Sequence, residues 1–176
     1  SSDEIGTAIK TLRFPLFVKP AKAGDSLGID ENSLVLTEKE LFEKTNYLLT
    51  EFGSVLIEEY IDGREFTVLV AADPSNKNAV KTFVPVEYRF PKGNRFKTYA
   101  LKTSELHTDC NFPVEESELD QALRLASEKI FRAFNGKGYA RLDFRTNAQN
   151  ELFFLEINFT CSVFYLDGYE GSADYI

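Results

Sequence analysis

Residues 139–158 read YARLDFRTNAQNELFFLEIN, in which two stretches of alternating apolar and polar residues flank a turn-forming segment at 147–150. This pattern predicts a β-hairpin whose strands direct successive side chains to opposite faces. Symmetrical pairing about the turn places Asp143 opposite Phe154. One face then carries the polar residues Arg141, Asp143, Glu156 and Asn158. The other face carries an apolar set suited to burial, Leu142, Phe144, Phe153, Leu155 and Ile157.

The polar face has two interpretations. Two carboxylates and an amide supply hard oxygen ligands, and a neighbouring arginine suits a charged oxyanion, so the face fits a Mg²⁺ site for phosphate chemistry. The same side chains could instead form a salt-bridged surface that binds nothing. The hairpin alone leaves both interpretations open.

The composition indicates a folded globular protein. Of the 176 residues, 43% are hydrophobic and 27% are charged, a balance typical of globular rather than disordered chains. The net charge of -8 argues against binding to nucleic acid, which normally requires a basic surface. Apolar runs stay well below the roughly 18 residues of a membrane span, so we expect no membrane insertion.

Cysteine and histidine are scarce. Cys110 and Cys161 are the two cysteines, too few for a disulfide scaffold, so we expect reduced thiols and a cytoplasmic location. His107 is the single histidine, which excludes a zinc site built on a histidine cluster.

A glycine-containing loop follows the first apolar strand. Lys19 ends that strand, and the loop then contains Gly24, Ser26 and Gly28. Backbone N–H groups of such a loop could approach phosphate oxygens, with the lysine as a point charge. An ordinary glycine-containing turn is the alternative.

A predicted strand at 55–61 is followed by a strong turn signal at 62–63 and a predicted return strand at 65–71. Backbone groups at 58–61 could hydrogen-bond a purine, and Glu65 could accept hydrogen bonds from ribose hydroxyls. A solvated acidic hairpin is the alternative.

The segment 89–110 lacks sustained periodicity and carries Lys102 among other basic residues. We interpret it as a long functional loop, either a lid over phosphates or a solvated basic loop.

The order of predicted elements indicates an α+β fold. Helices are predicted over 37–52, starting with a capping box, and over 117–134, with Ser117 as the N-cap. The order is strand, helix, hairpin, then loop, helix, hairpin. It predicts two lobes, residues 1–72 and 73–176, each a small antiparallel sheet packed on a helix. A cleft between two such lobes is a natural ligand site.

Four segments, in order and with compatible spacing, resemble the ATP-grasp fold and, within it, the D-alanine–D-alanine ligase branch. They are FVKPAKAGDSLGI (17–29), VLIEEYIDGREFTVLV (55–70), FKTYALK (96–102) and GYARLDFRTNAQNELFFLEIN (138–158). They look like the family's phosphate-binding strand and loop, its adenine-binding hinge, its F-x-x-Y-x-x-K element and its metal-binding hairpin. The resemblance runs from about Phe14 to about Thr160 and implies that ATP binds between the two lobes.

For the nucleotide, the resemblance implies contacts with phosphates, adenine and ribose. The phosphates would be contacted by Lys19 and Lys102. The lid over them would comprise Ser26, Leu27 and Gly28. The adenine would be held by Glu58 and the backbone of Glu59, Tyr60 and Ile61, and the ribose by Glu65.

For the chemistry, the resemblance implies two Mg²⁺ ions, with Mn²⁺ as a substitute, bound by Asp143, Glu156 and Asn158. Arg141 would steady the acyl phosphate and the tetrahedral intermediate, and the further catalytic residues would be Lys102 and Ser26. A carboxylate that attacks the γ-phosphoryl group brings anion to anion, so metals and cations must neutralise the charge.

The chain departs from the family pattern at both ends. The family's N-terminal domain and its last helix have no counterpart here, so we expect the chain to be part of a longer protein. After the metal-site asparagine the family resembles N-T-S-P-G, whereas residues 158–163 read NFTCSV. We therefore predict an ATP-dependent carboxylate–amine ligase acting on small molecules, without assuming D-alanine. The alternatives are an ATP-grasp ligase of peptide or glutathione-synthase-like specificity, and a non-catalytic nucleotide-binding regulatory module.

Overall fold

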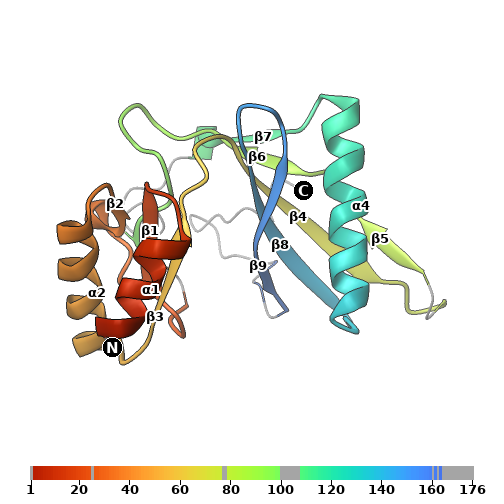
Figure 1. The fold of residues 1–176 in the computed structure, drawn as a ribbon. Coiled ribbons are helices and arrows are strands. Elements are labelled where there is room, and N and C mark those ends of the chain that lie inside the picture. The colour runs from red at the N-terminus through yellow and green to blue at the C-terminus, as the bar shows by residue number, and fades with distance from the viewer. Residues whose placement is uncertain are drawn as a thin grey trace. The chain divides into compact units, whose positions relative to one another are not determined.

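The computed structural model describes residues 2–24, 26–76, 79–99, 108–159, 161 and 163. The chain divides into two compact units (Figure 1). Unit 1 comprises Ser1–Tyr60 and Lys92–His107, and unit 2 comprises Ile61–Pro91 and Thr108–Ile176. Each unit has its own antiparallel sheet and its own apolar core, which confirms the predicted α+β class.

Unit 1 is built on a three-stranded sheet in the order β2–β1–β3, with both neighbours antiparallel to β1. Its elements are α1 (Ser2–Thr11), β1 (Leu16–Pro20), the 3-10 helix η1 (Glu31–Ser33), β2 (Leu34–Val35), α2 (Glu38–Phe52) and β3 (Val55–Glu59). Helix α2 packs against β1. The buried core consists of Ile5, Leu16, Val18, Val35, Leu41 and Leu48.

Helix α2 follows its local sequence signals. The hydroxyl of Thr37 accepts a hydrogen bond from the N–H of Glu40, and the Glu40 carboxylate accepts one from the N–H of Thr37, which confirms the capping box. Gly53 ends the helix in the left-handed conformation, at a φ of 74°. Inside the helix Lys44 is buried, which the sequence pattern did not predict.

Unit 2 is built on a six-stranded antiparallel sheet in the order β7–β6–β4–β8–β9, with β5 also paired to β4. Its elements are β4 (Glu65–Ala72), β5 (Val80–Thr82), β6 (Val86–Tyr88), the 3-10 helix η2 (Thr108–Cys110), β7 (Asn111–Pro113), α4 (Ser117–Ala133), β8 (Tyr139–Thr146) and β9 (Leu152–Asn158). Helix α4 packs against β4 and β5 (Figure 1). The buried core consists of Phe66, Val68, Val70, Val114, Leu119, Leu123, Phe131, Ala140, Leu142 and Phe144.

The predicted hairpin between 55–61 and 65–71 is wrong. β4 pairs with β8 from one end to the other, whereas β3 pairs with β1. β4 therefore belongs to the sheet of unit 2, and the compact units divide after residue 60 rather than after residue 72 as expected.

The turn signal at 62–63 marks a close approach rather than a hairpin turn. A Cβ atom on Gly63 would overlap the carbonyl oxygen of Thr146, at the end of β8. The N–H of Thr146 donates to the carbonyl of Arg64 at 3.0 Å. Glycine is required here because the two backbones touch.

Helix α4 begins differently from the prediction. The N-cap residue is Glu116, not Ser117, and its side chain makes no capping hydrogen bond. The Glu116 carboxylate instead accepts a hydrogen bond from Nη2 of Arg64 at 3.0 Å. Glu116 therefore pairs with a residue far away in the sequence, just before β4, instead of capping the helix.

The helices of the described ranges are amphipathic elements of two small domains. In that part of the chain, none combines the length and the apolar character that crossing a membrane requires.

Candidate functional site

The four polar residues of the hairpin share one face, as predicted. β8 pairs antiparallel with β9, so that Asp143 is opposite Glu156 and Arg141 is opposite Asn158. The opposite face contributes to the apolar core through Leu142, Phe144 and Ile157. The alternation therefore predicted the polar set correctly, but the predicted place of Phe153 on the apolar face is wrong, because Phe153 pairs with Arg145 and Phe154 pairs with Phe144.

The register that produces this face differs from the symmetrical one. Near the turn Thr146 pairs with Leu152, so the loop is one residue longer than expected. A bulge after Asp143 adds a second shift, so that Asp143 faces Glu156 rather than Phe154. One shift alone would turn the side chains of β9 to the wrong face, and the second restores them. The bulge is what brings the two carboxylates together.

Arg141 and Asp143 form a doubly bonded ion pair on this face. Nε of Arg141 donates to Oδ1 of Asp143 and Nη2 donates to Oδ2, both at 3.0 Å, and the two side chains are 19% and 17% exposed. The hydroxyl of Thr67 on β4 donates to Oδ1 of Asp143 at 2.8 Å. Burial lowers the pKa of Arg141, but the charges of Asp143 and Glu156 outweigh it and raise that pKa above its ordinary value. Arg141 therefore stays cationic and fixes the Asp143 carboxylate.

The other potential metal ligands on this face are oxygen atoms. Nδ2 of Asn158 donates to Oε1 of Glu156 at 3.0 Å. The side-chain carbonyl oxygen of Asn158 is therefore the atom that would bind a metal ion. An all-oxygen set suits Mg²⁺ or Mn²⁺. In the described part of the chain, no group of three or more Asp, Glu, His or Cys residues could hold a metal ion. A cation on this face would therefore need Asn158 and the oxygens of a ligand.

Lys19, at the end of β1, lies beside Glu58 of β3. Nζ of Lys19 is 2.8 Å from Oε1 of Glu58, and the side chains are 18% and 33% exposed. Glu58 pairs with Phe17, two residues before Lys19, so both charged side chains lie on the same face of the sheet. The structure thus brings together two of the residues expected to contact a nucleotide.

Glu59 and Tyr60 fix the end of β3 within unit 1. The Glu59 carboxylate accepts hydrogen bonds from the side chain and, at 2.9 Å, the backbone N–H of Arg13, and these bonds lower its pKa. The backbone N–H of Tyr60 donates to Pro15 at 2.9 Å, and its ring stacks on Phe17. Recognition of a purine by backbone groups would require a strand end held in this way. Ile61, also expected there, is the first residue of unit 2.

The glycine-containing loop of unit 1 consists of tight turns. The N–H of Leu27 donates to Gly24 and the N–H of Ile29 donates to Ser26, both at 3.0 Å. Ser26 and Gly28 have left-handed backbones, with φ values of 58° and 78°. The predicted turn is present, and its contact with phosphate stays a prediction.

Lys102 lies outside the described residues, so its predicted phosphate contact has no structural test. Phe96 and Tyr99, which precede it, contact other parts of unit 1. The ring of Phe96 meets that of Phe17 edge to face, with centroids 4.9 Å apart. The N–H of Tyr99 donates to the carbonyl of Ile29, just after the glycine-containing loop, at 3.2 Å.

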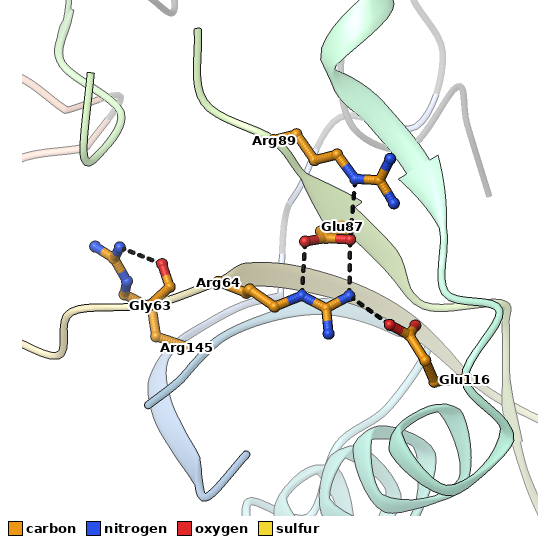
Figure 2. A network of polar contacts seen from close by, with 6 residues as sticks. All are labelled: Gly63, Arg64, Glu87, Arg89, Glu116 and Arg145. Carbon is orange, nitrogen blue, oxygen red and sulfur yellow. Dashed lines mark hydrogen bonds and ion pairs between the residues drawn. The ribbon is translucent and has the colours of Figure 1, made fainter. Parts of the chain in front are cut away.

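Glu65 begins β4, where a network of charged side chains fixes the strand (Figure 2). Arg64 donates to both oxygens of Glu87, at 2.7 and 2.8 Å, and also to Glu116. Arg89 donates to Glu87 at 3.2 Å. The hydrogen bonds from Arg64 outweigh burial and lower the pKa of Glu87, whose side chain is 8% exposed. This network therefore fixes the position of the backbone next to Glu65.

The sequence reasoning missed Thr67 and the Arg64–Glu87 pair. Thr67 meets Asp143 because β4 pairs with β8, and no local signal reveals which strands pair. A charged residue inside a strand-like stretch was the available hint for Glu87, since such residues are seldom buried unless they are paired.

Comparisons with known proteins agree with the motifs. The family described as "D-ala D-ala ligase C-terminus" matches residues 1–163. The D-alanine–D-alanine ligase of Rickettsia canadensis is 35% identical over 153 residues, which are 85% of this chain and 40% of the relative. The VanG D-Ala:D-Ser ligase of Enterococcus faecalis has a TM-score of 0.70 at 23% identity, covering 89% of this chain and 43% of its own. An ATP complex of the D-alanine–D-alanine ligase from Bacillus anthracis has a TM-score of 0.60 at 21% identity. The match covers 90% of this chain and 43% of that ligase chain.

The structural matches show the fold, and the sequence matches show the family. The chain spans less than half the length of the curated relatives it matches. The family match nonetheless covers almost all of this chain, and the resemblance drawn from the four motifs is confirmed. The chain therefore has the ATP-grasp fold and belongs to the family of D-alanine–D-alanine ligase C-terminal domains.

Proposed function

We propose that this chain is the nucleotide-binding and catalytic part of an ATP-dependent carboxylate–amine ligase. The observation that carries the proposal is the polar hairpin face, where Asp143 and Glu156 lie opposite each other beside Arg141. The curated relative is named a ligase, and one solved neighbour contains ATP. Both fit a site for phosphoryl transfer.

The hairpin face of unit 2 would carry the chemistry. Asp143, Glu156 and Asn158 would hold Mg²⁺, which supplies charge neutralisation for phosphoryl transfer. We propose two ions, with Mn²⁺ as a substitute. Arg141 is oriented by its two bonds to Asp143, so it is preorganised to stabilise an oxyanion when an amine attacks the acyl phosphate.

Each unit carries residues that we propose for binding the nucleotide. In unit 1, Lys19 would contact the phosphates and the loop would cover them through Ser26, Leu27 and Gly28. The adenine would contact Glu58, Glu59, Tyr60 and Ile61, and the ribose Glu65. Lys102 would add a second phosphate contact, and with Ser26 it would assist catalysis.

The two substrates are a small carboxylate and a small amine. The named relatives join D-alanine to D-alanine or to D-serine, so the acceptor differs even among these proteins. Residues 158–163 depart from the family pattern, and we therefore do not propose D-alanine itself. Peptide or glutathione-synthase-like specificity fits the same hairpin.

A second candidate is a nucleotide-binding module without ligase activity. It is favoured by the two bonds from Arg141, which occupy both carboxylate oxygens of Asp143. A metal would have to share or displace these bonds.

Mg²⁺-dependent release of ADP distinguishes the two candidates. The protein that contains this chain is incubated with ATP and pairs of carboxylates and amines. Asp143→Ala and Glu156→Ala should each reduce ADP release by about 10²-fold or more. Glu151→Ala, at the turn of the same hairpin, is the matched control and should retain activity. If wild-type protein binds ATP but releases no ADP with any pair, the ligase proposal fails and the binding module remains.

A further inference from the structure

A buried lysine of unit 1 contacts the end of the glycine-containing loop. The side chain of Lys44 on α2 is 5% exposed. Its Nζ donates to the carbonyl of Gly28 at 3.2 Å and to Oδ1 of Asp30 at 2.8 Å. Burying an ammonium group is costly unless it is paired and hydrogen-bonded. None of the roles proposed above uses Lys44, so its buried charge needs another explanation.

Gly28 leaves the loop in a conformation that only glycine adopts readily. Its φ is 78°, and an added Cβ would come within 2.7 Å of Cγ of Pro20 and 2.9 Å of the Phe52 ring. The end of the loop is therefore packed between β1 and α2. The bond from Lys44 fixes the orientation of the Gly28 carbonyl within that space.

Asp30 is a firm second anchor for Lys44. Its carboxylate caps η1 by accepting from the N–H of Asn32 at 2.9 Å, and its own N–H donates to Oγ of Ser33 at 3.1 Å. Ser33 is fully buried. Lys44 thus connects the loop end to a capped turn, with Ile29 held between the two contacts.

We propose that Lys44 is a positioning residue that holds loop residues 26–28 ready to bind phosphate, acting through Gly28. The ligand in this inference rests on the proposed function, whereas the effect on the free loop does not. Without Lys44 the loop would spend part of its time in other arrangements. The apparent affinity for nucleotide would then fall in proportion to the lost population of the binding-competent arrangement. Bound nucleotide selects the competent arrangement of the loop, including Ser26, so KM for ATP should rise while kcat, measured at saturation, stays nearly constant.

The test compares Lys44→Met with Lys39→Met on the full chain. Met matches the length of lysine without its charge. Lys39 lies on the same helix, 84% exposed, and is the matched control. Hydrogen exchange at the N–H groups of Leu27 and Ile29 reports on the loop, and calorimetry with Mg-ADP reports on binding. We expect roughly tenfold faster exchange and roughly tenfold weaker binding in Lys44→Met, with wild-type values in the control.

Each outcome of this test supports or overturns the inference about Lys44. Wild-type exchange rates in Lys44→Met overturn the inference, whatever the nucleotide does. Faster exchange with unchanged Mg-ADP binding also overturns it, because the loop would then not need to be held. A wild-type chain that binds no Mg-ADP overturns the proposed function and the phosphate ligand of this inference. The exchange rates then still decide whether Lys44 holds the loop, so the two failures are distinguishable.

A second variant covers the case in which Lys44→Met does not fold. Asp30→Asn keeps an oxygen that can cap η1 but removes the ionic partner of Lys44. We expect the same two changes at about a third of the size. Wild-type behaviour of Asp30→Asn in both measurements would then overturn the inference.

Discussion

The polar face of the hairpin in unit 2 and the glycine-containing loop of unit 1 are held by different kinds of contact. On the hairpin, Arg141 binds Asp143 two residues away, and Glu156 lies directly across the strand pair. In the loop, Gly28 is held by Lys44, sixteen residues later on another element. The polar set on the paired strands follows from short-range alternation, although its alignment needs the bulge, whereas the loop depends on a side chain that arrives from elsewhere.

Breaking the hairpin face should have the largest effect. Arg141→Met leaves the Asp143 carboxylate largely buried with the hydroxyl of Thr67 but without its cation. We expect the free energy of unfolding of the chain to fall by about 3 kcal/mol, measured by urea denaturation. Arg132→Met is the control, because Arg132 forms an exposed pair on α4 and should cost less than about 0.5 kcal/mol. Equal effects in the two variants would show that the face is not held by this pair.

Gly63→Ala should have the next largest effect. It tests whether the end of β8 depends on contact with residues outside the hairpin. The added methyl group would meet the carbonyl of Thr146, and backbone at the end of β8 cannot move aside as a side chain can. We expect a loss of about 2 kcal/mol in thermal unfolding. Gly6→Ala is the control, since nothing lies near its Cβ in α1, and it should stabilise by about 0.5–1 kcal/mol. A neutral Gly63→Ala would contradict the close approach.

Two glycines of the loop in unit 1 provide a smaller, internal contrast. Gly28→Ala combines a left-handed backbone with a crowded Cβ, so it should cost about 1–2 kcal/mol. Gly24→Ala meets no atom within 4 Å and should change stability by less than about 0.5 kcal/mol. Urea denaturation of both variants checks this contrast. If both cost the same, the loop end is not fixed as described.

The smallest effect depends on pH and involves Glu87. Because Arg64 lowers the pKa of Glu87, its carboxylate stabilises the folded state above the unfolded pKa of about 4.3. That contribution should disappear as the pH falls from about 4.3 through the lower folded pKa. Glu87→Gln should lose about 1 kcal/mol at pH 7 and show a flatter dependence of stability on pH than wild type in this acidic range. The exposed Glu118→Gln is the control and should keep the wild-type slope.

Much of the fold, including the pairing of β8 with β9, could be predicted, but the partner of β4 could not. The capping box of α2 spans only a few residues, so local hydrogen bonding determines it, and alternation indicates the polar set of the hairpin. The partner of β4 is different, because Asp62-Gly63 is equally compatible with a turn to β3 and with a close approach to Thr146. Packing of the whole sheet decides between them.

The sequence by itself determined which polar side chains of the hairpin share a face, and it identified the family through four ordered motifs. Only the tertiary structure decided that a bulge after Asp143 aligns the carboxylates, that β4 joins the second sheet, and that Lys44 reaches Gly28. The reason is physical. Alternation and capping act over a few residues, whereas register, strand partners and buried ion pairs depend on the packing of segments far apart in the chain.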